Sequence, residues 1–533
     1  MTRPVVEAPT SSPVQARAVP HRWWVLAVLC TSLLIVSVDT TILNVALPVM
    51  ARTMHASTSQ LQWISDAYAI VLAGLLLVMG SLGDRVGRKK VYMAGLAAFA
   101  TFSALAAWSG SPDRLIATRA LMGVGAAAIM PCTLSLLINV FTEPDERGRA
   151  IGIWSGTTGL GVAVGPLAGG WLLNHFWWGS VFLINVPIVV VALLGARFLV
   201  PDSRDVSAKA PDPVGAGLSV AGMSLVLWGV IEAPSWGWRS SGVLGSIAAG
   251  LFTLGCFLGW EHHSSHPMLE LSLFSARRFS VAVAAMGAVL FGLMGSLFLL
   301  TQYLQFSLAY SPFAAGLRTA PIAGVVLVVA PMSMVLVRLV GTKPVLGAGM
   351  ACVALGMVLL WRTTVHGTYA EALPAFLLLG VGAGLSLAPS TDSVMGTLPL
   401  PRAGVGSATN GASLQLGAAL GIGVLGSILN TRYQHRLAPL LRAARVPGPV
   451  NRLISGSLGG ALTVAHRVGG GLGATLSAAA RVAFVSGMDL AMMAGAVVVA
   501  SGAVLVVLAL PNRARPGVTE KNDRRLPGRD AAA

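Results

Sequence analysis

The sequence predicts an all-α polytopic membrane protein with fourteen transmembrane helices. Of its 533 residues, 55% are hydrophobic and only 11% are charged, and the mean hydropathy of +0.76 is far above that of soluble domains. Fourteen apolar runs are each long enough to cross a hydrocarbon core of roughly 30 Å. The net charge of +16 is typical of basic loops facing an anionic leaflet, so we expect no nucleic-acid partner.

The apolar runs divide the chain into six, two and six spans. A polar segment, 1–22, is expected to be a disordered cytoplasmic tail. Two halves, 23–200 and 279–510, enclose a central region, 201–278, and a basic cytoplasmic tail, 511–533, follows. The expected spans are 23–50, 60–82, 91–109, 114–140, 149–174, 179–200, 214–233, 242–260, 279–306, 312–340, 344–361, 370–393, 404–430 and 484–510.

The positive charges indicate the orientation of these spans. An even number of spans places both termini on one side of the membrane, and the short segments on that side hold most of the Lys and Arg residues. Positive loops stay inside, so we expect a multi-pass protein of a bacterial cytoplasmic membrane with both termini cytoplasmic. One outer segment, 431–483, is rich in Arg and has no acid. We expect a long outer loop there, which could form an amphipathic helix on the outer leaflet.

The segment between the second and third spans reads GSLGDRVGRKK over Gly80–Lys90. A basic turn that anchors a hairpin is the simplest interpretation. The order of glycines, acid and bases also resembles the signature loop of the major facilitator superfamily. That resemblance implies the major facilitator fold, in which two six-helix halves move against each other, and a conformational latch in this loop. The latch residues would be Gly80, Gly83, Asp84, Arg85, Gly87 and Arg88.

Asp39, Asp66 and Arg119 lie inside the predicted first, second and fourth spans, where charge is costly and indicates function. A rise of 1.5 Å per residue places Asp39 about 24 Å from the inner end of its span and Asp66 about 8 Å from the outer end of its own. Arg119 reaches a depth similar to that of Asp66, so we expect the three to share one layer. They could form a structural cluster, with Arg119 neutralising one aspartate and the other reaching the interface. Alternatively they form a titrating site that loads a proton in one state and releases it in another.

Further motifs favour the titrating site. The run Asp39–Pro48, DTTILNVALP, resembles the first-helix motif of the drug:proton antiporters within the superfamily, and Arg119 begins a run similar to their fourth-helix motif. The resemblance implies that Asp39 and Arg119 couple transport to protons. The fifth span resembles the antiporter signature helix, whose glycines allow close packing. Its residues are Gly161, Gly165, Pro166, Gly169 and Gly170.

The two extra central spans are typical of the fourteen-helix branch. The second helix, which contains an aspartate, most resembles the second helix of the exporters of quaternary ammonium compounds and cationic dyes in that branch. This likeness implies hydrophobic, mostly cationic substrates. Gln415 stands about where several such exporters have an acid, which leaves fewer membrane carboxylates. The substrate-binding candidates are Asn44, Asp66, Tyr68, Gln302 and Gln415.

We therefore expect a proton-coupled antiporter for multidrug efflux, a secondary transporter and not an enzyme. The sequence has no phosphate-binding loop for ATP, so we expect no cofactor. The HHxxH cluster of His262, His263 and His266 lacks a fourth ligand, so no metal is expected. The expected partners are drug-like compounds, protons and lipids, with no obligate protein partner. The alternatives are an exporter of one neutral or anionic metabolite, such as a self-made antibiotic, and a membrane enzyme or scaffold, whose catalytic constellation the sequence lacks.

Overall fold

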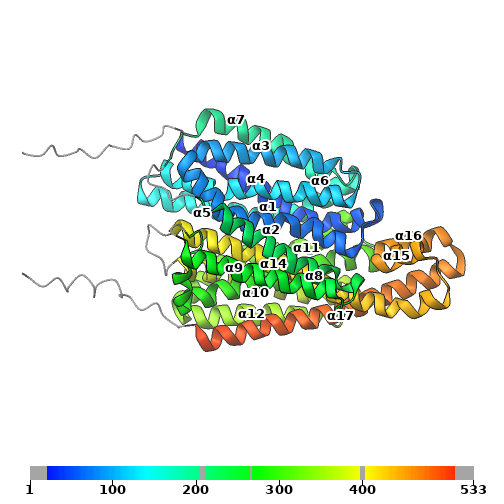
Figure 1. Cartoon of the computed structure of the whole chain (residues 1–533). Coiled ribbons are helices and arrows are strands. Elements are labelled where there is room, and N and C mark those ends of the chain that lie inside the picture. The colour runs from blue at the N-terminus through cyan, green and yellow to red at the C-terminus, as the bar shows by residue number, and fades with distance from the viewer. Residues whose placement is uncertain (1–20, 205–210, 265–266, 396–402, 511–533) are drawn as a thin grey trace, which may run out of the picture.

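The computed structural model describes residues 21–204, 211–264, 267–395 and 403–510. Fourteen of its helices are long and apolar enough to cross a membrane, as predicted. They lie side by side along one direction, and α1 begins and α17 ends at the same end of the bundle (Figure 1). We call this the tail end and the opposite one the loop end. The two predicted tails lie outside the described residues, apart from the last two residues of the first, 21 and 22.

Six spans make up the first half. A capping box at Ser57 starts α2. The Ser57 hydroxyl accepts from the backbone amide of Gln60, and the Gln60 side chain accepts from the backbone amide of Ser57. The sixth span is divided by a break at Ile184. The helices are α1 (Arg22–Thr53), α2 (Thr58–Val86), α3 (Arg88–Ala107), α4 (Pro112–Val140), α5 (Pro144–His175), α6 (Ser180–Leu183) and α7 (Asn185–Leu199).

The second half contains six spans and begins at η1 (Leu271–Ser275), a short helix that leads into α10. The ninth span, α10, ends in one turn of π-helix. The helices are α10 (Arg277–Gln302), η2 (Tyr303–Ser307), α11 (Pro312–Val340), α12 (Thr342–Leu360), α13 (Tyr369–Met395), α14 (Ala403–Ala443) and α17 (Gly470–Ala509).

The two halves repeat one tight turn. Gly87 alone separates α2 from α3, with φ at 126°, and Gly341 alone separates α11 from α12, with φ at 95°. Side chains avoid these positive angles, so glycine is required at both positions. The equivalent turns support a repeat of the same helical arrangement in the two halves.

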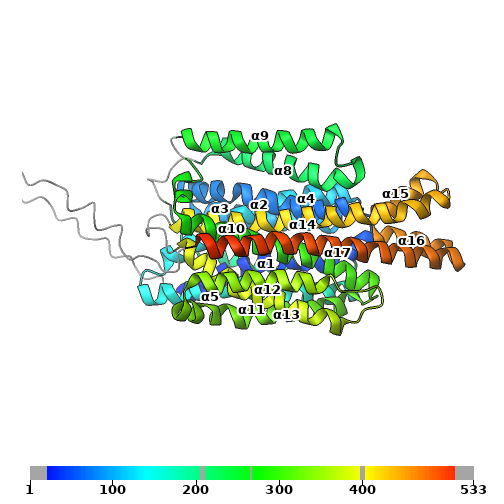
Figure 2. The ribbon, with the colours of Figure 1, turned by 90° about the horizontal axis from the view of Figure 1, so that it is seen from below.

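The two central helices form a hairpin on one side of the bundle. α8 (Pro213–Trp236) packs on α2 and α14, and α9 (Ser241–His263) packs mainly on α8. Figure 2 shows the pair as a separate layer beside the two halves. The hairpin therefore covers one of the two places where the halves meet.

The outer segment 431–483 is mostly helical, and its helices continue from the spans on either side. α14 continues to Ala443, α15 (Gly448–Gly456) and α16 (Leu458–Val468) follow, and α17 begins at Gly470. Figure 1 shows this extension projecting beyond the loop end, not lying flat across it. Tyr433, Leu437 and Leu441 are buried and spaced by four, which places them on one helix face.

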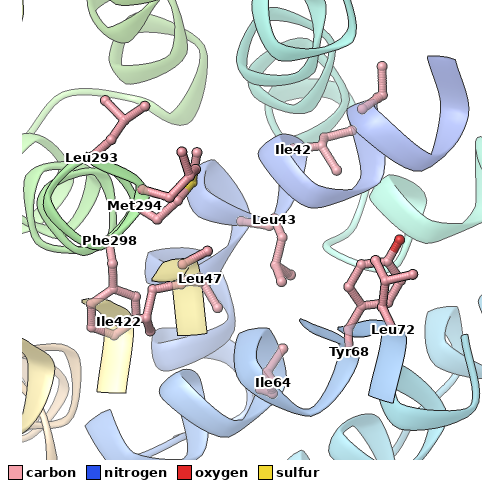
Figure 3. Close-up of a cluster of buried hydrophobic side chains, with 14 of the residues drawn as sticks. Ile42, Leu43, Leu47, Ile64, Tyr68, Leu72, Leu293, Met294, Phe298 and Ile422 are labelled. Atoms are coloured by element: carbon pink, nitrogen blue, oxygen red, sulfur yellow. The ribbon is translucent and has the colours of Figure 1, made fainter. Parts of the chain in front are cut away.

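The halves pack together near the loop end through apolar side chains. Figure 3 shows Leu47 of α1 beside Phe298 of α10 and Ile422 of α14, with Met294 of α10 nearby and Leu43 of α1 towards α2. All five side chains are at least nine-tenths buried. Their burial stabilises contact between α1 in the first half and α10 and α14 in the second.

Candidate transport site

Asp39 of α1 and Arg119 of α4 form an ion pair inside the bundle. The Arg119 guanidinium donates to Asp39 Oδ2 at 2.5 Å, and the two side chains are 1% and 0% exposed. A charge this deeply buried requires a partner, since desolvation costs several kcal/mol per ion. The structure therefore brings together the two residues that the motifs assign to proton coupling.

Two further contacts position Arg119. Its Nε donates to the carbonyl of Ile64 on α2 at 3.1 Å, and its guanidinium carbon lies 4.3 Å from the centre of the Tyr68 ring. A carbonyl and an aromatic face both attract a cation. Arg119 thus retains favourable contacts with α2 even when the Asp39 carboxylate is neutral.

Asn185 also contacts Asp39, a contact that we did not assign from the sequence. Its side-chain amide donates to Asp39 Oδ1 at 3.1 Å and to the hydroxyl of Ser103 at 2.9 Å. Ser103 in turn donates to the carbonyl of Phe182 at 2.8 Å. The break between α6 and α7 places Asn185 at the first residue of α7. The signal available in the sequence is a buried amide in an otherwise apolar run, just before Pro187.

Asp66 lies away from this pair. Its side chain is 0% exposed, and Oδ2 lies 3.4 Å from the position that a Cβ on Gly423 of α14 would occupy, next to Leu227 of α8. No described residue gives either carboxylate oxygen a hydrogen bond. The structure therefore assigns Asp66 to the contact of α2 with α8 and α14, not to the group formed by Asp39 and Arg119.

Gln62, one turn from Asp66 on the same face of α2, joins the two halves. Its side-chain amide donates to the carbonyls of Ile422 at 3.1 Å and Gly423 at 2.8 Å. Gln62 is completely buried. Because an amide in an apolar span has no conspicuous motif, we did not single out this residue in the sequence.

The remaining polar candidates do not gather around Asp39. Asn44 donates to the Thr40 carbonyl at 3.5 Å within α1, and Gln302 donates to the Phe298 carbonyl at 3.1 Å within α10. Gln415 is half-buried on α14. Tyr68 is the one candidate that contacts the ion pair, through Arg119.

The signature loop holds an ion pair of its own. Arg88 donates to Asp84 at 2.6 Å across one helical turn, whereas Arg85 is exposed. Gly83 packs so closely on α4 that an added Cβ would lie 2.8 Å from the sulfur of Cys132. At Gly80 an added Cβ would be in ordinary contact with Pro131, at 3.4 Å. In this conformation the loop holds α2 against α4 within the first half.

The glycines of α5 form two close contacts. Towards α1, a Cβ on Gly161 or Gly169 would come within 2.5 Å of Ser37 or Ile42, and Gly165 lies directly against Thr41. Such distances force a clash, so these positions require glycine.

On its other side α5 packs on α11. Pro166 contacts Gly316, and a Cβ added to Gly170 would lie 2.7 Å from the backbone of Phe313. α5 therefore links the two halves near the loop end.

The profile of the Major Facilitator Superfamily matches residues 29–422. The chain belongs to this superfamily. Two curated relatives cover almost the whole transporter. This chain is 36% identical to the multidrug efflux pump LfrA of Mycolicibacterium smegmatis, over 93% of this chain and 98% of the relative. It is 33% identical to the tetracenomycin C resistance and export protein of Streptomyces glaucescens over 90% of each chain.

A solved structure agrees with this fold. The transporter superposes on a bacterial homologue of the human lysosomal transporter Spinster with a TM-score of 0.63, covering 92% of this chain and 97% of the other at 17% identity. The shared architecture is that of a membrane transporter. Two six-helix halves and the added α8–α9 hairpin therefore form a multi-pass facilitator.

The described residues contain no group of three or more His, Cys, Asp or Glu side chains placed to hold a metal. His262 and His263 lie at the end of α9, and His266 falls outside the described residues. The absence of a metal from the site remains an expectation from the sequence.

Proposed function

We propose that this facilitator exports hydrophobic, mostly cationic drugs or toxic compounds from the bacterial cytoplasm in exchange for protons. The buried pair of Asp39 and Arg119 is the observation that supports proton coupling most directly. Drug efflux is the activity named for its relatives LfrA and the tetracenomycin C exporter. Secondary transport driven by the proton gradient follows from the same residues, with no cofactor required.

In this mechanism the exchanged proton binds at Asp39 Oδ2. Protonation removes the charge that holds Arg119, which lowers the strength of the contact between α1 and α4. Arg119 then keeps its contacts with Ile64 and Tyr68 on α2. Asn185 holds Oδ1 and fixes the orientation of the carboxyl group in both protonation states. Proton loss restores the pair and resets the helices.

Alternating access would rock the two halves around their contacts at the loop end. Gly148, Gly152, Gly156 and Gly159, at the tail-end part of α5, have no atom within 4 Å of an added Cβ. The loop-end glycines of the same helix are closely packed. If the tail end is cytoplasmic, as the charges indicate, this arrangement corresponds to a state closed to the outside. The signature loop, with Asp84 and Arg85, would control the change to the opposite state.

Substrate recognition remains a proposal at the level of residues. Asp66 supplies a negative charge for cations, and Tyr68 an aromatic surface next to the proton site. Asn44, Gln302 and Gln415 complete the set of polar candidates.

The decisive experiment follows the efflux of a fluorescent hydrophobic cation from cells and from proteoliposomes, with and without a proton gradient. We expect accumulation against the concentration gradient only when the proton gradient is present. Export that persists after the gradient collapses would contradict proton coupling. The matched control is the Asp39→Asn variant in the same vesicles.

A dedicated antibiotic exporter is the second candidate, because one relative exports tetracenomycin C. Everted vesicles tested with a panel of cationic, neutral and anionic compounds distinguish the two. Transport of several unrelated cations supports multidrug efflux, whereas transport of one neutral or anionic compound alone supports the dedicated exporter.

A further inference from the structure

A pocket of about 660 Å³ lies outside the Asp39 site, on the side of the bundle that α8 and α9 cover. Pockets for drug-sized ligands are typically about 300–1,000 Å³. Its walls come from α2, α10 and α14 and from the tail-end parts of α8 and α9. The segment that joins α9 to α10 contributes Met268, Leu269 and Phe274 at the tail end. The pocket therefore exists because the chain has the two additional helices.

The pocket is almost entirely apolar. Among the described residues no charged side chain lines it, and its few hydroxyl groups are satisfied within the protein. Ser219 donates to the Ala216 carbonyl, Ser280 to the Phe274 carbonyl and Ser413 to the Val283 carbonyl. With no free polar group on its walls, the pocket selects the apolar body of a ligand by burial of surface.

The carboxylate of Asp66 lies just beyond the loop-end limit of this pocket. Three wall residues, Ile70 of α2, Met223 of α8 and Leu420 of α14, mark that limit. About one helical turn further along, each helix carries a residue of the Asp66 environment: Asp66 itself, Leu227 and Gly423. An unpaired, fully buried carboxylate next to an apolar pocket is a place for a cation.

We propose that this pocket receives the apolar body of an exported hydrophobic cation and that Asp66 neutralises its charge. The inference rests on the proposed export function and assigns the substrate to a site outside the central space between the halves.

This location also relates the substrate to the proton through one helix. Tyr68 and Asp66 are two residues apart and therefore about 200° apart around α2. Tyr68 contacts Arg119 of the proton site, and Asp66 faces α8 and α14. A rotation or shift of α2 changes both environments at once. Protonation of Asp39 therefore alters the affinity for a cation at Asp66, although the two carboxyl groups do not contact each other.

The test reduces the volume of the pocket by placing larger side chains on its wall. Ala284 of α10 lines it and is exposed within it, so Ala284→Val, Ala284→Leu and Ala284→Trp reduce its volume in steps. The control is Ala249→Trp, on an exposed position of α9 that does not line the pocket. Binding of tetraphenylphosphonium and of neutral Nile red is measured on the full chain in nanodiscs of phosphatidylethanolamine and phosphatidylglycerol.

We expect binding of both probes to weaken step by step, by about tenfold or more in Ala284→Trp, and to be unchanged in Ala249→Trp. Asp66→Asn should weaken binding of tetraphenylphosphonium and spare Nile red. An Ala284→Trp variant that binds tetraphenylphosphonium with wild-type affinity would overturn the pocket assignment. A pocket that holds only a lipid chain would give this same result. Equal loss of both probes in Asp66→Asn, or no loss, would overturn the role of its charge.

Two comparisons keep the inference separate from the proposed function. If the wild type binds tetraphenylphosphonium in the pocket but no proton gradient drives its export, the export function fails and the site stands. If export is proton-driven and Ala284→Trp exports normally, the site fails and the function stands. Thermal unfolding of each variant identifies a folding defect, and the small Ala284→Val change provides a result if Ala284→Trp does not fold.

Discussion

At the scale of single residues, the proposed proton site is a carboxylate held by two donors, one of which has further contacts of its own. Asp39 accepts from a guanidinium and an amide, and the guanidinium retains a carbonyl and an aromatic ring on α2. The guanidinium therefore has partners on α2 besides the Asp39 carboxylate. These additional partners support the proposal that Asp39 exchanges a proton while Arg119 stays bound to α2.

Asp39→Asn should abolish uphill export and preserve the fold. An asparagine can still accept from Arg119 through its single oxygen but carries no exchangeable proton, so we expect proton-driven accumulation in proteoliposomes to fall to the leak rate. Exchange of substrate down its own gradient should continue. Asp113→Asn, at an exposed carboxylate that contacts Gln60, serves as control. Near-normal accumulation by Asp39→Asn would remove Asp39 from the coupling step.

Asp66→Leu should stabilise the protein while impairing export of cations. The Asp66 carboxylate is fully buried and has no hydrogen-bond partner among the described residues, and a buried unsatisfied polar group costs about 1–3 kcal/mol. Replacing it by an apolar side chain should raise the free energy of unfolding by about that amount. Thermal unfolding in detergent, paired with dye export, checks both effects. A clear loss of stability would mean that Asp66 has a favourable partner.

At the scale of elements, α5 depends on glycine where it packs on α1 and α11, whereas the glycines of its tail-end part have room for a side chain. Gly165 lies against Thr41 and the backbone of Ile42, so a methyl group there must push the helices apart. Gly159, on the same helix, has nothing within 4 Å of an added Cβ. Gly159 can therefore serve as the control position for a substitution of Gly165 in the same helix.

Gly165→Ala should lower the free energy of unfolding by about 1–3 kcal/mol through overpacking. Gly159→Ala should leave it unchanged or raise it by up to about 1 kcal/mol, because alanine favours helix. Reversible unfolding of the purified variants measures the difference. Similar behaviour of the two variants would contradict the close packing of α5 on α1.

The extension formed by α14, α15, α16 and α17 attaches to both halves at the loop end. Thr58 of α2 donates to the Gly456 carbonyl at 3.0 Å, and Tyr433 of α14 donates to the Ile454 carbonyl at 2.9 Å. Gly459 lies close to Ala51 of α1 and Phe306 of η2. These contacts add to the closure of the loop end.

At the scale of the whole molecule, Gln62 connects the two halves where they close. Its amide bonds to Ile422 and Gly423 exist only while α2 and α14 are in contact. Breaking them affects the balance between conformations more than the stability of either half.

Gln62→Leu should shift this balance towards the state open at the loop end. Loss of two buried hydrogen bonds corresponds to about 1–3 kcal/mol, equivalent to a change of about 5- to 150-fold in the ratio of states. Distances between spin labels on the two halves at the loop end report the shift. Gln302→Leu is the control, because Gln302 bonds within its own helix. An unchanged distance distribution would show that Gln62 does not hold the halves together.

Much of this molecule follows from the sequence because a bilayer imposes simple rules. Hydrophobic length determines the number of spans, and the described helices reproduce the predicted fourteen. An ionisable group in a span needs a partner, which made Asp39 and Arg119 candidates before their contact was known. Asn185 and Gln62 were not singled out because several uncharged amides lie in the spans, and sequence alone does not show which of them join neighbouring helices.

Only the tertiary structure decided which side of a helix each residue faces. Depth along α2 suggested that Asp66 lies with Asp39 and Arg119, but rotation about the helix directs it towards α8 and α14 instead. The projection of the helices in 431–483 beyond the loop end and the apolar pocket beside α8 and α9 were equally undetermined by the sequence. Hydropathy records how deep a residue lies in the membrane, whereas the neighbours of a buried face depend on packing between helices distant in the chain.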